Sequence, residues 1–253
     1  MDGELAGYLI GAARENEWWS RHVWIGLVGH AARDPELVRD LYRFAAARWV
    51  DGGAELHVAL VPAVPELSEP WFRLAFGHMQ LHGIRETGGT GAAPPAGITV
   101  RFGTIEDLEG APELVTQIWD HHTGPSTFTG LTVPPVEEFL ADWKTTLETS
   151  GVAYFVAERD GRVVGHLLLE PEEPDLARPP GSIYLAVAAT LPEARGTGAG
   201  VALTDAALAW AGDAGYTTVQ TDWRVANLES SRFWPRRGFR ETFYRMARRV
   251  NIG

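Results

Sequence analysis

One stretch of the 253-residue chain, from Gly181 to Gly200, restricts its possible folds more than any other. Apolar residues run without interruption from Ile183 to Ala189, which predicts a buried β-strand. Three glycines follow at alternate positions, and the apolar residues beyond them recur at the spacing of a helix. The stretch therefore predicts a strand, a sharp turn at Gly196, Gly198 and Gly200, and the start of a helix.

The glycine turn has the properties of an anion site. The first backbone N–H groups of a helix lack partners within the helix, and the helix dipole is positive at that end. Because glycines carry no side chains that would keep an anion away, the backbone alone can bind a pyrophosphate group there. Arg195, just before the turn, adds a fixed positive charge.

A second segment, from Asn227 to Phe239, strengthens this interpretation. It contains the asparagine, Ser230 three residues later, an aromatic pair and a final Gly-Phe. Together with Arg195–Gly200, which has the pattern Arg-x-x-Gly-x-Gly, it resembles the two signatures of the Gcn5-related N-acetyltransferase (GNAT) superfamily. The resemblance covers residues 97–250.

The resemblance implies an α/β (α+β) fold in which a mixed, mostly antiparallel central sheet is flanked by helices. The residue pattern agrees with that fold. It predicts strands over 98–103, 152–158, 162–170, 182–190, 216–222 and 239–249, and helices over 106–121, 134–149, 198–213 and 228–236.

The resemblance also implies an activity. The expected reaction is an acyl-CoA-dependent N-acyl transfer, with acetyl-CoA as co-substrate and direct attack by the amine of a small molecule. The residues expected to bind the cofactor are Ala188, Ala189, Thr190, Arg195, Gly196, Thr197, Gly198, Ala199, Gly200, Asn227 and Ser230.

The catalytic residues are less well determined. Asp222, which ends a strand beside the expected cofactor site, and His121, which ends a helix next to His122, are both candidate bases. Trp234 stands where the family commonly has a tyrosine, and an indole N–H has no useful acidity for the leaving sulfur. A non-catalytic protein that binds acyl-CoA or another partner therefore remains the alternative. A dinucleotide-binding fold is disfavoured because Val201 stands in the place of its third glycine.

The segment before residue 86 resembles the second half of the chain. Arg33 and Ser68 match Arg195 and Ser230, each 162 residues later. The first hairpin matches at an offset of 158, so the offset drifts by only four residues, and such domain-sized matches indicate an internal duplication. We therefore expect a tandem arrangement with a truncated copy that lacks its first strand and two helices.

The first copy has lost the features of an anion site. Glu36 and Val38 replace the second and third of the three glycines, so this copy is not expected to bind coenzyme A. A glycine- and proline-rich segment separates the copies. The predicted domains are a degenerate partial GNAT-like domain at 1–85, a linker at 86–97 and a complete GNAT domain at 98–253.

Composition limits the classes of binding partner that we expect. The net charge of −11 argues against nucleic acid, and the absence of cysteine together with eight histidines that lack ligand spacing predicts no metal site. No apolar run is long enough for a membrane span, and the start of the chain does not resemble a leader, which predicts a cytoplasmic protein. The exposed sheet edge of the truncated copy makes a homodimer possible. The identity of the acceptor amine and the acyl chain length are not predicted.

Overall fold

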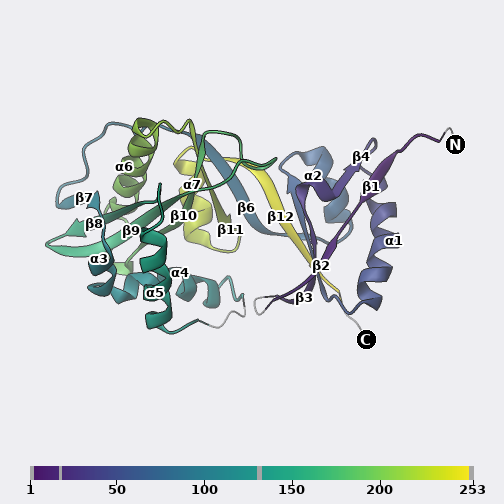
Figure 1. The fold of residues 1–253 in the computed structure, drawn as a ribbon, viewed down its shortest axis with the longest axis horizontal. Helices are drawn as coiled ribbons and strands as arrows, with labels where there is room; N and C mark the ends of the chain where they lie inside the picture. The colour runs from purple at the N-terminus through teal and green to yellow at the C-terminus, as the bar shows by residue number, and fades with distance from the viewer. Residues whose placement is uncertain (1–2, 17–18, 130–132, 251–253) are drawn as a thin grey trace. The chain divides into compact units, whose positions relative to one another are not determined.

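The computed structural model describes residues 3–16, 19–129 and 133–250, which belong to two compact units (Figure 1). Unit 1 contains the residues up to Gly83, the segment 223–225 and the residues from Glu241 onward. Unit 2 contains Ile84–Asp222 and Ala226–Arg240. The two units are described separately below.

The sheet of unit 2 is mixed and mostly antiparallel, as predicted. Its strands lie in the order β11 (Thr218–Arg224), β10 (Ser182–Thr190), β9 (Arg162–Pro171), β8 (Ala153–Arg159) and β7 (Ile98–Phe102). All neighbouring pairs are antiparallel except β10 and β11, which run parallel. The parallel pair is joined through α6 (Ala199–Asp213), the helix that the glycine turn begins.

Helices cover both faces of this sheet (Figure 1). Side chains of consecutive strand residues point to opposite faces. On β8, Tyr154 and Val156 pack in one apolar cluster with side chains of α3 (Ile105–Glu109), α4 (Pro112–Thr123) and α5 (Val136–Leu147). Phe155, between them, meets Trp210 of α6 edge to face. The glycine-started helix and the α3–α5 group therefore lie on opposite faces.

One predicted helix is wrong. The sequence pattern predicts a single helix over 106–121, whereas the structure has α3 and α4 separated at Gly110 and Ala111. Pro112 has no backbone N–H and a φ angle suited to a helix start, so it begins α4 instead of continuing α3.

Unit 1 has a smaller sheet with the same kinds of pairing. Its order is β2 (Ala12–Asn16), β3 (Ser20–Ile25), β5 (Leu56–Pro62), β12 (Arg240–Arg249) and the first part of β6 (Gly77–Glu86). The pair β3 and β5 is parallel, whereas β2 with β3 and β5 with β12 are antiparallel. A separate two-stranded sheet joins β1 (Gly7–Leu9) to β4 (His30–Ala32).

The core of unit 1 lies between its sheet and the helices α1 (Leu37–Asp51) and α2 (Pro65–Arg73). It is built on Val23, Tyr42, Trp71 and Phe76, together with Met246 from β12. The last strand of the chain thus completes the first unit. The predicted domains at 1–85, 86–97 and 98–253 stay a prediction, since the compact units are assembled from different chain segments.

The glycine- and proline-rich segment after β6 lies along α6. The Gly88 N–H donates to the Leu208 carbonyl at 3.0 Å, and the Thr90 hydroxyl donates to Asp205 at 2.8 Å. Between them, Gly89 lies so close to the Asp205 carbonyl that a Cβ would be only 2.6 Å from it. The segment is therefore fixed on unit 2 by its own contacts, which a free flexible connection would lack.

Candidate active site

The glycine turn leads directly into α6. Gly198 is the N-cap with a left-handed φ of 90°, and Gly196 has a φ of 75°, both of which favour glycine. The Ala202 N–H donates to the Gly198 carbonyl at 2.9 Å. The N–H groups of the preceding helical residues, Ala199 and Gly200 among them, therefore have no partner inside α6. Donation by these N–H groups to a bound anion stays a prediction.

Gly200 lies between two other elements of unit 2. A Cβ on Gly200 would lie 3.6 Å from the ring of Phe233 in α7 (Leu228–Arg236) and 3.7 Å from the Thr190 methyl group at the end of β10. Both distances are ordinary van der Waals contacts, so β10, α7 and the start of α6 meet closely at Gly200. A Cβ on Gly198 would instead lie only 2.6 Å from Cγ of Pro95.

Arg195 has two neighbours at the turn. Its Nη2 donates to Nε2 of His121 at 2.6 Å, and its Nη1 lies 3.9 Å from the Glu229 carboxylate. His121 is on the last turn of α4, so the structure places this candidate base beside the glycine turn.

The strands β10 and β11 pair only over Ser182–Tyr184 and then separate. At the point of separation the Thr221 hydroxyl donates to the Leu185 carbonyl at 3.0 Å, and β10 has a bulge between Leu185 and Val187. Beyond it, residues as far as Thr190 pair with β9 on one side only. The edge of β10 that faces β11, including Ala188 and Ala189, can therefore pair with an extended ligand.

Asp222 lies on β11 just past this separation. The Tyr184 hydroxyl donates a short hydrogen bond to its Oδ1. Glu170 lies opposite Tyr184 in the β9–β10 pair, and partial burial raises the pKa of this carboxyl above its usual range. Asp222 and His121 thus lie at different ends of the exposed β10 edge. Tyr184 and Glu170 were not predicted as site residues, although the pairing of two predicted strands would bring such polar residues together.

Asn227 and Ser230 form the start of α7. Oδ1 of Asn227 accepts the N–H groups of Glu229 and Ser230, each at 3.1 Å, so Asn227 is the N-cap of this helix. The Ser230 hydroxyl donates to the Asn227 carbonyl at 3.3 Å. Trp234 is 6% exposed and packs edge to face against Phe239, which gives it a role in the core.

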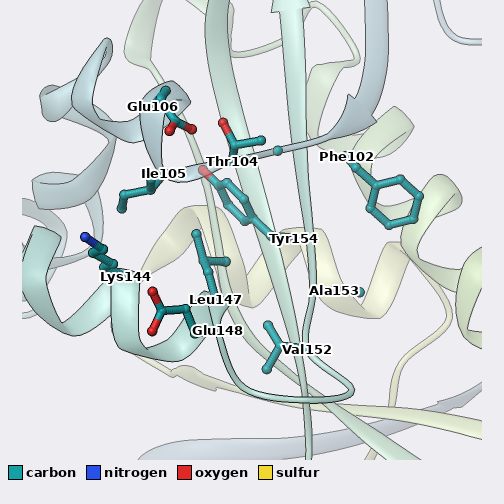
Figure 2. A pocket seen from close by; sticks show the side chains of 11 residues that line it. Phe102, Thr104, Ile105, Glu106, Lys144, Leu147, Glu148, Val152, Ala153 and Tyr154 are labelled. Carbon is teal, nitrogen blue, oxygen red and sulfur yellow. The ribbon is translucent and has the colours of Figure 1, made fainter.

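A separate hollow of about 360 Å³ lies between α3, the end of α5 and the start of β8 (Figure 2). Its walls include Ile105, Leu147 and Tyr154, and Lys144 and Glu148 lie at its rim (Figure 2). None of the residues predicted to bind the cofactor lines it. It is therefore distinct from the glycine turn and the separated strands.

The described part of the chain offers neither a metal centre nor a membrane-spanning helix. Within 3–16, 19–129 and 133–250, no group of three or more histidine or carboxylate side chains could hold a metal ion. No helix in these ranges is long and apolar enough to cross a membrane.

Solved structures define the class of fold. A GCN5-related N-acetyltransferase from Sphaerobacter thermophilus is 16% identical over 98% of this chain and 78% of its own, with a TM-score of 0.61. One from Kribbella flavida is 17% identical over 98% of this chain and 89% of its own, with a TM-score of 0.57. A tandem GNAT protein of the clavulanic acid biosynthesis pathway is 13% identical over 96% of this chain and 79% of its own, with a TM-score of 0.55. The fold is that of an N-acetyltransferase.

The family follows from the sequence of unit 2. The model of the acetyltransferase (GNAT) family matches residues 115–239, which contain the end of α4, the glycine turn and α7. No curated protein sequence matches the chain. The family match therefore applies to residues 115–239.

Proposed function

We propose that unit 2 binds acetyl-CoA and transfers its acetyl group to the amine of a small molecule. The observation that carries this proposal is the alignment of two features along β10. The strand edge exposed by the separation from β11 begins near Tyr184 and leads to the glycine-bounded start of α6. A pyrophosphate and an extended pantetheine arm need such a helix start and such a strand edge, in that order.

The residues present fit this ligand. Gly200 adds no side chain beside Thr190 and Phe233 at the start of α6. Arg195 and the N–H groups at Ala199 and Gly200 would hold the pyrophosphate, and Thr197 and Gly198 shape the turn. Backbone groups of Ala188, Ala189 and Thr190 would hold the pantetheine arm, with Asn227 and Ser230 on the facing helix.

The thioester of acetyl-CoA supplies an activated acyl group. The attacking amine nitrogen forms a bond to the acetyl carbon while the carbon–sulfur bond breaks, and the electron pair leaves with sulfur. Asp222 is the proposed acceptor of the amine proton, because it lies where the strands separate and Tyr184 orients its carboxylate. A thiol pKa of about 8.5 lets the sulfur leave as thiolate without an acid, so the buried Trp234 is no obstacle.

Two measurements test the proposal. Titration calorimetry of acetyl-CoA into the protein should show saturable binding of one equivalent per chain. A thiol reagent should then report release of coenzyme A in the presence of a panel of primary amines, without background because the chain has no cysteine. The Asp222→Asn variant should bind acetyl-CoA normally and lose about 100-fold in turnover. Wild-type protein that binds no acetyl-CoA would rule the proposal out.

A non-catalytic acyl-CoA-binding protein is the second candidate. The buried Trp234 favours it, because no tyrosine hydroxyl is available from that position to protonate a leaving thiolate. Binding of acetyl-CoA without thiol release on any amine of the panel would support this candidate over the enzyme.

We also infer that unit 1 derives from a degenerate partial copy of the same fold. Helices α1 and α6 both have 15 residues, α2 and α7 both have 9, and β5 and β11 both have 7. In each unit the 15-residue helix joins two strands of a parallel pair. Likeness to a tandem GNAT protein supports the same inference.

A further inference from the structure

The contact between Arg195 and His121 joins the glycine turn to α4. Nη2 of Arg195 lies 2.6 Å from Nε2 of His121, which is a hydrogen-bonding distance. A guanidinium group is always a donor, so the imidazole nitrogen must be the acceptor. Nε2 of His121 is therefore occupied by this contact.

The end of α4 is held in place by further contacts in unit 2. The Ser126 hydroxyl donates a short hydrogen bond to the Ala226 carbonyl, just before α7. The N–H and the hydroxyl of Thr129 both donate to the His122 carbonyl at 2.9 Å. These contacts fix the backbone around His121 relative to the start of α7. His121 can therefore act as a fixed support for a flexible arginine.

Arg195 needs such a support. Its side chain is 37% exposed, and the Glu229 carboxylate at 3.9 Å attracts it toward α7. An exposed arginine that pairs with one carboxylate gains little and loses side-chain freedom in doing so. The hydrogen bond to His121 adds a directional contact. It keeps the guanidinium at the turn without neutralising it.

We propose that His121 is a positioning residue that acts through Arg195 to favour acetyl-CoA binding, and that it is not the base of the reaction. This rests on the proposed function of unit 2. The lone pair that a base would use already accepts a hydrogen bond from Arg195. The polar pair Tyr184 and Asp222 lies at the other end of the exposed β10 edge, where the strands separate.

A double-mutant cycle tests this role with acetyl-CoA binding as the readout. Arg195→Gln should weaken binding about tenfold or more, since it removes a charge-assisted contact to the pyrophosphate. His121→Ala should weaken binding about threefold to tenfold in the wild-type background. In the Arg195→Gln background, His121→Ala should have no further effect. His121→Gln should keep most of the affinity, because its amide oxygen can accept the same hydrogen bond.

The other outcomes overturn the inference. Equal losses from His121→Ala in both backgrounds would show that His121 acts independently of Arg195. An unchanged affinity in His121→Ala, or a His121→Gln variant as weak as His121→Ala, would exclude the positioning role. Failure of the wild-type protein to bind acetyl-CoA would reject the proposed function together with this inference. That result is distinguishable from a failure of this inference alone, because it is measured on the wild-type protein without any variant.

Discussion

A valine at position 200 is the sharpest test of the glycine-bounded helix start. Gly200 lies in the first turn of α6 and is not among the residues with positive φ. A Cβ there meets Phe233 at 3.6 Å and Thr190 at 3.7 Å, which are ordinary van der Waals distances. The Cβ itself fits, so we expect Gly200→Val to fold with a small adjustment of Phe233 or Thr190 and to place its two methyl groups at the predicted pyrophosphate site. Valine is also the residue at position 38, the equivalent place in the first copy.

The expected loss follows from the contacts that an anion would make. Each charge-assisted hydrogen bond contributes about 1.5–3 kcal/mol. Displacing the pyrophosphate from even one backbone N–H should therefore weaken acetyl-CoA binding by about 10- to 150-fold. The folded state should be almost unaffected, because valine is slightly better than glycine inside a helix.

Gly212→Val is the matched control. Gly212 lies near the other end of α6, and a Cβ there would meet Thr87 at a similar 3.6 Å. Titration calorimetry should show near-wild-type affinity for Gly212→Val and a large loss for Gly200→Val, while thermal melts of the two variants stay close. Equal affinities for acetyl-CoA in all three proteins would refute the assignment of the helix start as the pyrophosphate site.

Three further predictions concern stability. Gly198→Ala should lower the free energy of unfolding by about 1–3 kcal/mol in urea titrations, because its φ is 90° and its Cβ would lie 2.6 Å from Pro95; an unchanged midpoint would contradict this. Arg101 donates to Asp107 at 2.6 and 2.8 Å and holds the pKa of that carboxyl below its ordinary value of 3.8. The stabilisation that this ion pair gives the folded protein is therefore present above pH 3.8, and it is lost as the pH falls through the lower pKa that Asp107 has in the folded state. Asp107→Asn should thus cost about 1–2 kcal/mol at pH 7 and progressively less toward pH 2, measured by urea unfolding. His166 is 1% exposed and burial lowers its pKa from 6.5 to about 4, so the unfolded state takes up the proton first as pH falls. Between pH 7 and pH 5 His166 should lower the free energy of unfolding by about 2 kcal/mol. The free energy of unfolding of His166→Leu should therefore depend less on pH over this range. If the wild-type and His166→Leu curves of this free energy against pH were parallel, the result would argue against a buried neutral imidazole.

The elements that the sequence predicts well are those fixed by local pattern. The apolar run before the glycines and the helical spacing after them predict β10 and α6, and both elements are found. The break between α3 and α4 also has a local signal, since Gly110 and Pro112 lie together, but the apolar spacing alone conceals it. Local chemistry therefore accounts for both the success and the error.

Contacts between distant segments could not be predicted in the same way. The Tyr184–Asp222 hydrogen bond depends on the register of two strands joined through a helix, and the sequence does not state that register. The contact of His121 with Arg195 depends on how α4 packs on the sheet. The pairing of β12 with β5 brings the last strand of the chain beside a strand of its first half. Each is decided by packing between elements that are far apart along the chain.

The start of α1 explains why an anion should bind to only one of two similar helices. In unit 1 the Glu36 carboxylate lies at this helix start and accepts from Arg39 at 2.9 Å and from Arg73 at 3.0 Å. Arg33, the match of Arg195, is paired with Glu4 at 2.7 Å. An incoming phosphate would have to displace an internal carboxylate and separate existing ion pairs, and it would gain no net new charge. In unit 2 the position equivalent to Glu36 is Gly198, which carries no carboxylate, so an external anion would not have to displace one from the start of α6.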